Sequence, residues 1–266
     1  HQQGEIIDKS IKILNNDPIQ KWLELEYDKS STAKKNASIA DIILKGESLG
    51  LVKFNSEGKD NFDSGFGGTK DTFIKIRDGK QIGNGKGTAK PKKYFDPKIE
   101  NIPVLESVLQ IIKSNVINWK DNNFSPKKPN RLALGSFMVW NSSGSLRRSK
   151  HGNKASAIDF NLRTSENKKI AFNQPDAEKM ILEVIKNLPK GNYGIGLPGQ
   201  GGFFPSESKW KSLGLSKHTS QLNGKSNKAY TKIINNNLKV ELEKRVKNSK
   251  TIIFPDNENH LHIQLQ

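Results

Sequence analysis

The sequence predicts an α+β fold, with a mainly helical first part and a second part that contains an antiparallel or mixed sheet with helices. Apolar residues recur at helical intervals over residues 6–14 and 102–119. Short runs rich in β-branched and aromatic residues follow after residue 130, separated by Gly-, Ser- and Lys-rich stretches. With 266 residues, of which 8% are aromatic, the chain can bury a substantial core.

Residues 1–95 are expected to form a mainly helical accessory or docking region. The apolar spacing over residues 6–14 predicts one helix, and Pro18 suits the start of the next. From residue 57 to residue 93 the composition shifts to Gly, Lys and Asp, with only short strand-like pieces such as residues 72–76. We therefore expect a Gly/Lys-rich linker and a domain boundary near residue 95.

Residues 96–266 are expected to form an α+β domain that can fold without the first part. Its helices should begin where apolar residues recur at three- and four-residue steps, and its strands should be the short β-branched runs. The expected helices are residues 102–119, 175–188 and 229–246, and the expected strands are residues 132–140, 155–162, 169–172, 193–197, 251–254 and 260–265.

The charge of the chain favours a polyanionic partner. Lys and Arg number 44 against 27 Asp and Glu, which gives a net charge of +17. Nucleic acid, anionic lipid and acidic cell-wall polymers all fit this charge. Only six of the cations are Arg, the residue best suited to reading bases, which weakens a sequence-specific DNA-binding interpretation. No apolar run approaches the roughly 20 residues of a membrane span.

The absence of cysteine excludes several kinds of metal site and of covalent catalysis. Without Cys, the chain has no disulfide, thiolate-bound zinc, iron–sulfur cluster or thiol nucleophile. A metal ion would have to be bound by His, Asp or Glu. The absence of Cys leaves the compartment open.

Three of the five His residues lie in two short polar clusters, residues 149–159 and 257–262. In an extended strand, residues two apart face the same way, so His260 and His262 should present their imidazoles side by side. Together with His151 and Asp159, one of these two His residues would supply three ligands for a catalytic Zn²⁺ ion and leave a fourth position for water.

Two motifs carry a resemblance to a known group of enzymes. Ser149-x-His151, followed by Ala157-Ile158-Asp159 and a closing His260-Leu261-His262, resembles the LAS-type zinc peptidases, which include D-alanyl-D-alanine metallopeptidases and the hedgehog-like fold. Residues 259–263 look most like the end of the penicillin-insensitive murein endopeptidases. The resemblance covers about residues 130–266. It implies a hedgehog/D-Ala-D-Ala-peptidase-like domain that hydrolyses bacterial peptidoglycan in a secreted or extracytoplasmic location.

The resemblance also assigns roles to individual residues. His151, Asp159 and His262 would bind Zn²⁺, while His260 would stand beside the metal and act as general base or stabilise the oxyanion. Glu258 lies four residues before His262, on the same strand face, and is the second candidate base or an orienting partner.

One departure from the family pattern concerns the first motif. Seven residues separate His151 from Asp159, where the family has six. We expect one extra residue in the turn, or a bulge at the start of the following strand, to absorb the difference.

The substrate-binding residues are less specific. Relatives often carry an Arg or Gln on the strand before the first zinc ligand, but residues 135–140 contain neither. Arg147, Arg148 and Ser149, directly before His151, are the candidates instead, because a guanidinium suits a carboxylate. Two solvated loop cations are an equally good interpretation of the Arg pair.

The leading hypothesis is therefore a zinc metallopeptidase that cuts stem or cross-link peptide bonds of peptidoglycan, with anionic wall polymers as further partners. The alternative from another class is a basic nucleic-acid-binding protein or a divalent-metal nuclease, so nucleic acid stays open as a partner. This alternative shares the charge but lacks interleaved aromatic residues along a basic strand and any helix-turn-helix or zinc-finger signal. The third hypothesis is a protein with the peptidase-like fold that binds the cell wall without catalytic activity.

Overall fold

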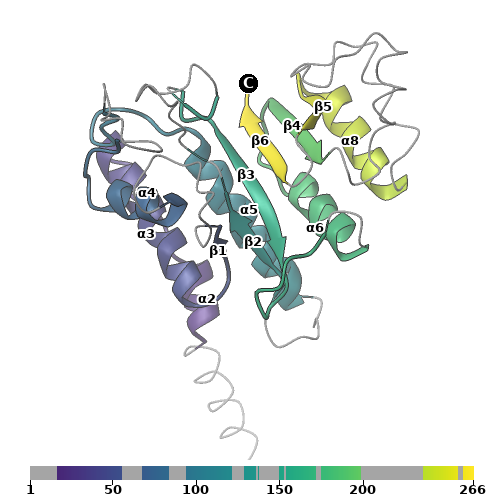
Figure 1. Cartoon of the computed structure of the whole chain (residues 1–266), viewed down its shortest axis with the longest axis horizontal. Coiled ribbons are helices and arrows are strands. Elements are labelled where there is room, and N and C mark those ends of the chain that lie inside the picture. Colours follow the sequence, from purple (N-terminus) through teal and green to yellow (C-terminus); the bar gives the residue numbers. More distant parts are fainter. Residues whose placement is uncertain are drawn as a thin grey trace, which may run out of the picture.

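A mixed six-stranded sheet runs through the centre of the molecule and carries helices against it (Figure 1). The computed structural model describes residues 17–55, 68–83, 94–121, 129–135, 137, 150–152, 154–171, 175–198, 236–256 and 260–266. Within these ranges the chain forms six helices and six strands, which confirms the predicted α+β class. The expected helix over residues 6–14 lies outside the described residues.

The helices begin where the sequence supplies capping groups and apolar periodicity. They are α2 (Pro18–Leu23), α3 (Thr32–Ser48), α4 (Gly68–Arg77), α5 (Val104–Asp121), α6 (Pro175–Lys186) and α8 (Asn236–Asn248). The side chain of Asp17 caps α2 by accepting from the backbone N–H of Ile19, and Ser31 caps α3 by accepting from Lys34. These bonds satisfy backbone donors that have no partner within the helix.

The strand-like piece expected at residues 72–76 is helical, and this expectation was wrong. The buried residues Thr69, Thr72, Phe73 and Ile76 follow the i, i+3, i+4, i+7 spacing of one helix face. Lys75 and Asp71 form an i,i+4 ion pair with Nζ and Oδ2 2.9 Å apart. A five-residue window shows the β-branched side chains but is too short to show this helical period.

The strands form the order β1-β2-β3-β6-β4-β5. Their bounds are β1 (Lys53–Phe54), β2 (Arg131–Leu134), β3 (Ala157–Arg163), β4 (Tyr193–Pro198), β5 (Ile252–Asp256) and β6 (Leu261–Leu265). The pairs β1–β2 and β4–β5 are parallel, and the remaining three pairs are antiparallel. Of the strand expected at residues 169–172, the described residues 169–171 contribute an isolated bridge between Lys169 and Arg163, and residue 172 lies outside the described residues.

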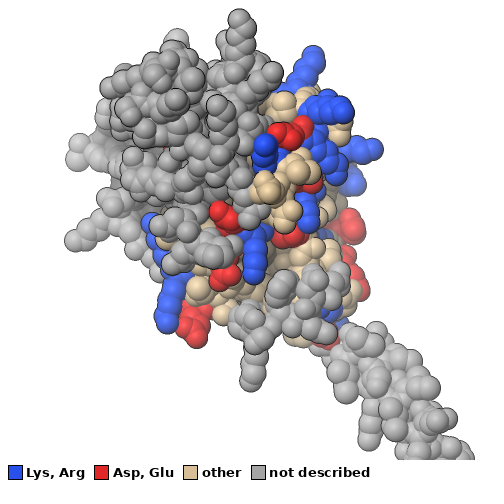
Figure 2. Space-filling view, turned by 90° about the vertical axis from the view of Figure 1, so that its right-hand side faces the viewer, with Lys and Arg blue, Asp and Glu red and all other residues tan. Residues whose placement is uncertain are grey.

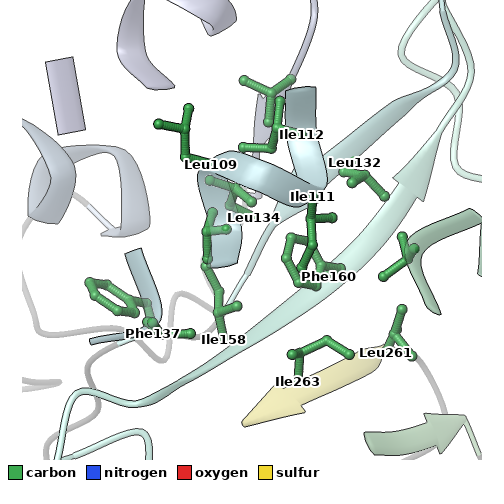
Figure 3. Packing of buried hydrophobic residues seen from close by; sticks show 14 of the residues in the cluster. Leu109, Ile111, Ile112, Leu132, Leu134, Phe137, Ile158, Phe160, Leu261 and Ile263 are labelled. Carbon is green, nitrogen blue, oxygen red and sulfur yellow. The ribbon is translucent and has the colours of Figure 1, made fainter. Parts of the chain in front are cut away.

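The two central strands have an apolar face and a polar face. Ile158 and Phe160 on β3 lie opposite Ile263 and Leu261 on β6, and all four are fully buried. Figure 3 shows these side chains beside apolar residues of α5 such as Ile111. Because side chains alternate along a strand, the intervening residues of β3 and β6 face the other side of the sheet. That side carries the polar residues described below.

A single hydrophobic cluster crosses the boundary expected near residue 95. It contains Trp22, Ile43 and Phe54 from the first part, together with Val108 and Phe160 from the second. The strand β1 pairs with β2, and α3 contacts α5. In the full chain the two parts therefore share one core, which favours folding as a unit. The functional division at residue 95 stays a prediction.

Candidate metal centre

Two of the predicted metal ligands come from neighbouring strands. Asp159 on β3 and His262 on β6 lie directly opposite each other in the antiparallel register. Directly opposed residues project to the same face, so their side chains meet. Nδ1 of His262 lies 2.9 Å from Oδ1 of Asp159, and both side chains are buried. The sheet register therefore places these two groups together.

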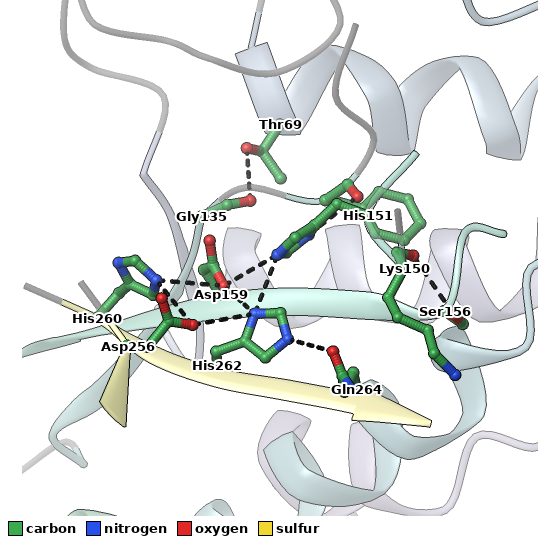
Figure 4. A network of polar contacts seen from close by, with 11 residues as sticks. Thr69, Gly135, Lys150, His151, Ser156, Asp159, Asp256, His260, His262 and Gln264 are labelled. Carbon is green, nitrogen blue, oxygen red and sulfur yellow. Dashed lines mark hydrogen bonds and ion pairs between the residues drawn. The ribbon is translucent and has the colours of Figure 1, made fainter. Parts of the chain in front are cut away.

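The third predicted ligand, His151, reaches the same point from the turn before β3. Its Nε2 lies 3.2 Å from Oδ1 of Asp159 and 3.0 Å from Nδ1 of His262. The three atoms form a nearly equilateral triangle (Figure 4). The structure thus brings together all three residues of the predicted ligand set.

The chain turns between Lys150 and Ser156, before β3 begins. The backbone N–H of Ser156 donates to the carbonyl of Lys150 at 2.8 Å and closes the turn. Ala155, at the end of that turn, has a φ of 45°, in the left-handed region that a non-glycine residue seldom adopts. The insertion or bulge expected relative to the family pattern stays a prediction, and Asp159 follows in β3 in register with His262.

Hydrogen bonds at the outer ring nitrogens define which nitrogen of each imidazole faces inward. Nδ1–H of His151 donates to the backbone carbonyl of Phe137 at 3.3 Å, and Nε2–H of His262 donates to Oε1 of Gln264 at 3.0 Å. Because these oxygens only accept, the single proton of each neutral ring sits on the outer nitrogen. The lone pairs of His151 Nε2 and His262 Nδ1 then point toward each other.

This donor set fits a metal ion. Two imidazole lone pairs and a carboxylate oxygen converge, and without a cation between them these three groups would repel one another. In a tetrahedral zinc site with bonds of about 2.0–2.1 Å, ligand atoms lie about 3.3 Å apart. The three edges of 2.9, 3.0 and 3.2 Å are within a few tenths of an ångström of that value. His151, Asp159 and His262 can therefore hold a metal ion.

The charges of the site favour a cation as well. Burial raises the pKa of Asp159, but the charge of His151 and hydrogen bonds from His151 and His262 outweigh it and hold this pKa far below its ordinary range. Burial lowers the pKa of His262, while Asp159 raises it and gives a net increase. Asp159 is therefore a buried anion at neutral pH, and it faces two imidazoles that can exchange a proton for a metal ion.

Beside the triad lie one predicted residue and one unexpected residue. Nε2 of His260 is 3.6 Å from Oδ1 of Asp159 and 3.6 Å from Oδ2 of Asp256. The same Asp256 oxygen is 3.6 Å from Nδ1 of His262. His260 therefore stands next to the three ligand candidates, with its Nε2 turned toward them (Figure 4).

Four other site residues predicted from the sequence are not placed. Glu258, Arg147, Arg148 and Ser149 all lie outside the described residues. Their roles as alternative base and as substrate-binding groups stay predictions.

Sequence reasoning missed two polar partners of the site. Gln264 continues the alternation of His260 and His262 on one strand face, so the period of two could have found it. Asp256 carries no such signal, because it belongs to β5, which is separated from β6 by β4. Only the order of the strands brings its carboxylate to the His residues.

Comparison with family models, with curated proteins and with solved structures finds no match to this chain. A search of the described helices finds none with the length and apolar character needed to cross a membrane.

Proposed function

We propose that this protein is a zinc-dependent peptidase that cleaves peptide bonds of bacterial peptidoglycan. The observation that carries the proposal is the inward-facing triad of two imidazole nitrogens and one carboxylate oxygen, with a further imidazole beside it. Zn²⁺ suits this set because it accepts nitrogen and oxygen ligands in a tetrahedral site, and three protein ligands are the usual number in a catalytic one.

The residues divide into two tasks. His151, Asp159 and His262 would hold the ion, and Phe137 and Gln264 orient the two imidazoles through their outer nitrogens. A zinc ion held in this way supplies Lewis-acid chemistry, because it polarises a carbonyl and lowers the pKa of water from 15.7 to about 7.

His260 is the described residue placed to handle a proton. Hydrolysis adds water to the peptide carbonyl, breaks the C–N bond and releases the amine with one added proton. Nε2 of His260, beside the triad, can hold that proton or stabilise the negative oxygen of the tetrahedral state. Glu258 remains the second candidate for this role.

The charge supports a wall polymer as the target. The net charge of +17 would concentrate the protein on a surface rich in carboxylates and phosphates, through an attraction that salt weakens. On the face drawn in Figure 2, basic side chains gather along one edge of the described surface, with acidic ones between them. A secreted or extracytoplasmic location is part of this proposal.

The test is digestion of purified peptidoglycan by the full chain. We expect release of free amines, abolished by a chelator, restored by Zn²⁺ and insensitive to β-lactams, because no acyl-serine is involved. His260→Ala should lower turnover by about 10²–10⁴-fold if this residue moves the proton. Nicking of DNA without amine release would favour the nuclease alternative, and metal binding without any cleavage would favour a silent wall-binding protein.

A further inference from the structure

The carboxylate of Asp256 lies next to His260 but outside the metal triad. Its Oδ2 is 3.6 Å from Nε2 of His260 and 3.6 Å from Nδ1 of His262. The three ligand atoms that cluster together belong to other residues. We propose that Asp256 is a positioning residue, whose carboxylate holds the imidazole of His260 against the metal site.

Asp256 reaches this point only because the strand between β5 and β6 has a glycine there. Gly196 on β4 lies directly opposite His262, and Asp256 lies two strands away from β6. A Cβ atom on residue 196 would be 2.7 Å from Oδ2 of Asp256 and 2.9 Å from Cβ of His262. The absence of a side chain at Gly196 therefore lets the Asp256 and His262 side chains meet across β4.

The other carboxylate near His260 is engaged elsewhere. Oδ1 of Asp159, the atom that faces Nε2 of His260, is the same atom that completes the triangle with His151 and His262. A bound cation draws electron density from that oxygen and weakens it as an acceptor. Oδ2 of Asp256 is not one of the three ligand candidates, so a second carboxylate, separate from that of Asp159, faces Nε2 of His260.

The position of Asp256 in the chain fits an orienting role. It is the last residue of β5, and β5 is held by parallel pairing with β4. Its carboxylate is therefore supported by the sheet, whereas His260 precedes the first residue of β6. A carboxylate held by a strand can fix the orientation of the His260 ring. Metal sites commonly use such neighbouring groups to orient the side chains around the ion.

The test is Asp256→Asn in the full chain, loaded with Zn²⁺ and dialysed. We expect the metal content to equal that of the wild type. Long-range ¹H–¹⁵N NMR of the His rings should show altered ring-nitrogen signals for His260, with those of His151 nearly unchanged. Glu243→Gln, which removes the same charge from an exposed position on α8, is the matched control and should alter neither readout.

The activity arm of this test rests on the proposed function. There, Asp256→Asn should lower kcat about 10–100-fold with little change in KM, and Asp256→Glu should restore part of it. If the wild type cuts no wall peptide, the peptidase proposal fails, while the NMR and metal readouts still decide the role of Asp256.

Two results would overturn the positioning role. Loss of the metal in Asp256→Asn would make Asp256 a ligand, and unchanged His260 ring signals would show that the carboxylate does not orient the ring. Gly196→Ala provides a second variant, because its methyl group would crowd Oδ2 of Asp256 and should alter the His260 signals as Asp256→Asn does, together with those of His262. If Gly196→Ala does not fold, Asp256→Asn decides alone.

Discussion

Nε2 of His151 lies 3.0 Å from Nδ1 of His262, although 111 positions separate the two residues in the chain. Both outer ring nitrogens donate hydrogen bonds to oxygen acceptors, so in the neutral rings the two facing nitrogens present lone pairs to each other. A shared cation resolves this arrangement, and Asp159 supplies the negative charge that such a cation needs.

The first prediction concerns the ligand set. The full chain, loaded with Zn²⁺ and dialysed, should retain about one ion per chain. Asp159→Ala and His262→Ala should each weaken binding by about 100-fold or more, because each removes a direct ligand. His260→Ala should keep the metal, since this residue stands beside the triad. Elemental analysis checks all three variants, and equal metal content in all of them would place the ion elsewhere.

The second prediction concerns the partner of the buried ring of His262. Gln264→Leu removes the acceptor of the Nε2–H hydrogen bond and should weaken metal affinity by about 10–100-fold. Gln264→Glu keeps an acceptor at the same place and should retain or increase the affinity. Competition titration against a chelating dye measures both. A wild-type affinity in Gln264→Leu would mean that packing, such as the contact with the Phe254 ring, suffices to orient His262.

The third prediction links folding stability to acid pH through Glu106. Its Oε1 accepts from the hydroxyl of Tyr27 at 2.8 Å and lies 3.0 Å from Nζ of Lys35. Burial raises the pKa of Glu106, but these two partners outweigh it and lower the pKa below its ordinary value of 4.5. A carboxylate whose pKa is lower in the folded state stabilises the protein when the pH is above its ordinary pKa. This stabilisation is lost as the pH falls through the lowered pKa of the folded state.

Glu106→Gln should therefore have a lower melting temperature than the wild type at pH 7, and the difference should shrink as the pH falls below about 4. The effect should be small, about 0.2–1 kcal/mol, because the side chain is partly exposed. Glu243→Gln, on the exposed face of α8, should show no such pH dependence. If the difference in melting temperature between wild type and Glu106→Gln grew toward acid pH, the pKa of Glu106 would be raised in the folded state, not lowered.

The fourth prediction concerns the boundary near residue 95. A fragment of residues 96–266 should lose cooperative unfolding, because it lacks α3, which contacts α5, and β1, which pairs with β2, together with Trp22, Ile43 and Phe54 of the shared core. Each such side chain contributes about 1.5–3 kcal/mol by burial, and the whole protein has only about 5–15 kcal/mol in total. The full chain, which keeps these elements, is the reference. Calorimetry distinguishes the two, and a sharp transition in the fragment would restore the two-domain interpretation.

The sequence was enough to name the three residues that the structure brings together as candidate metal ligands. The triad of His151, Asp159 and His262 followed from residue types that bind metals and from a family resemblance, and the strand period placed His260 and His262 on one face. The strands later named β3, β4 and β6 and the helices α5 and α6 were also predicted, because each has a strong apolar period of its own. These helices and strands depend on neighbours within a few residues.

Contacts between distant segments were decided by tertiary structure alone. The run at residues 72–76 became part of α4 because Phe73 and Ile76 are buried in the core on one helix face. Asp256 reached His260 because the strand order places β4 between β5 and β6, and because Gly196 leaves room over that strand. The outer hydrogen bonds that turn the imidazoles inward come partly from the carbonyl of Phe137, an atom that every residue carries. No local pattern encodes such a contact, since its energy exists only once the sheet has formed.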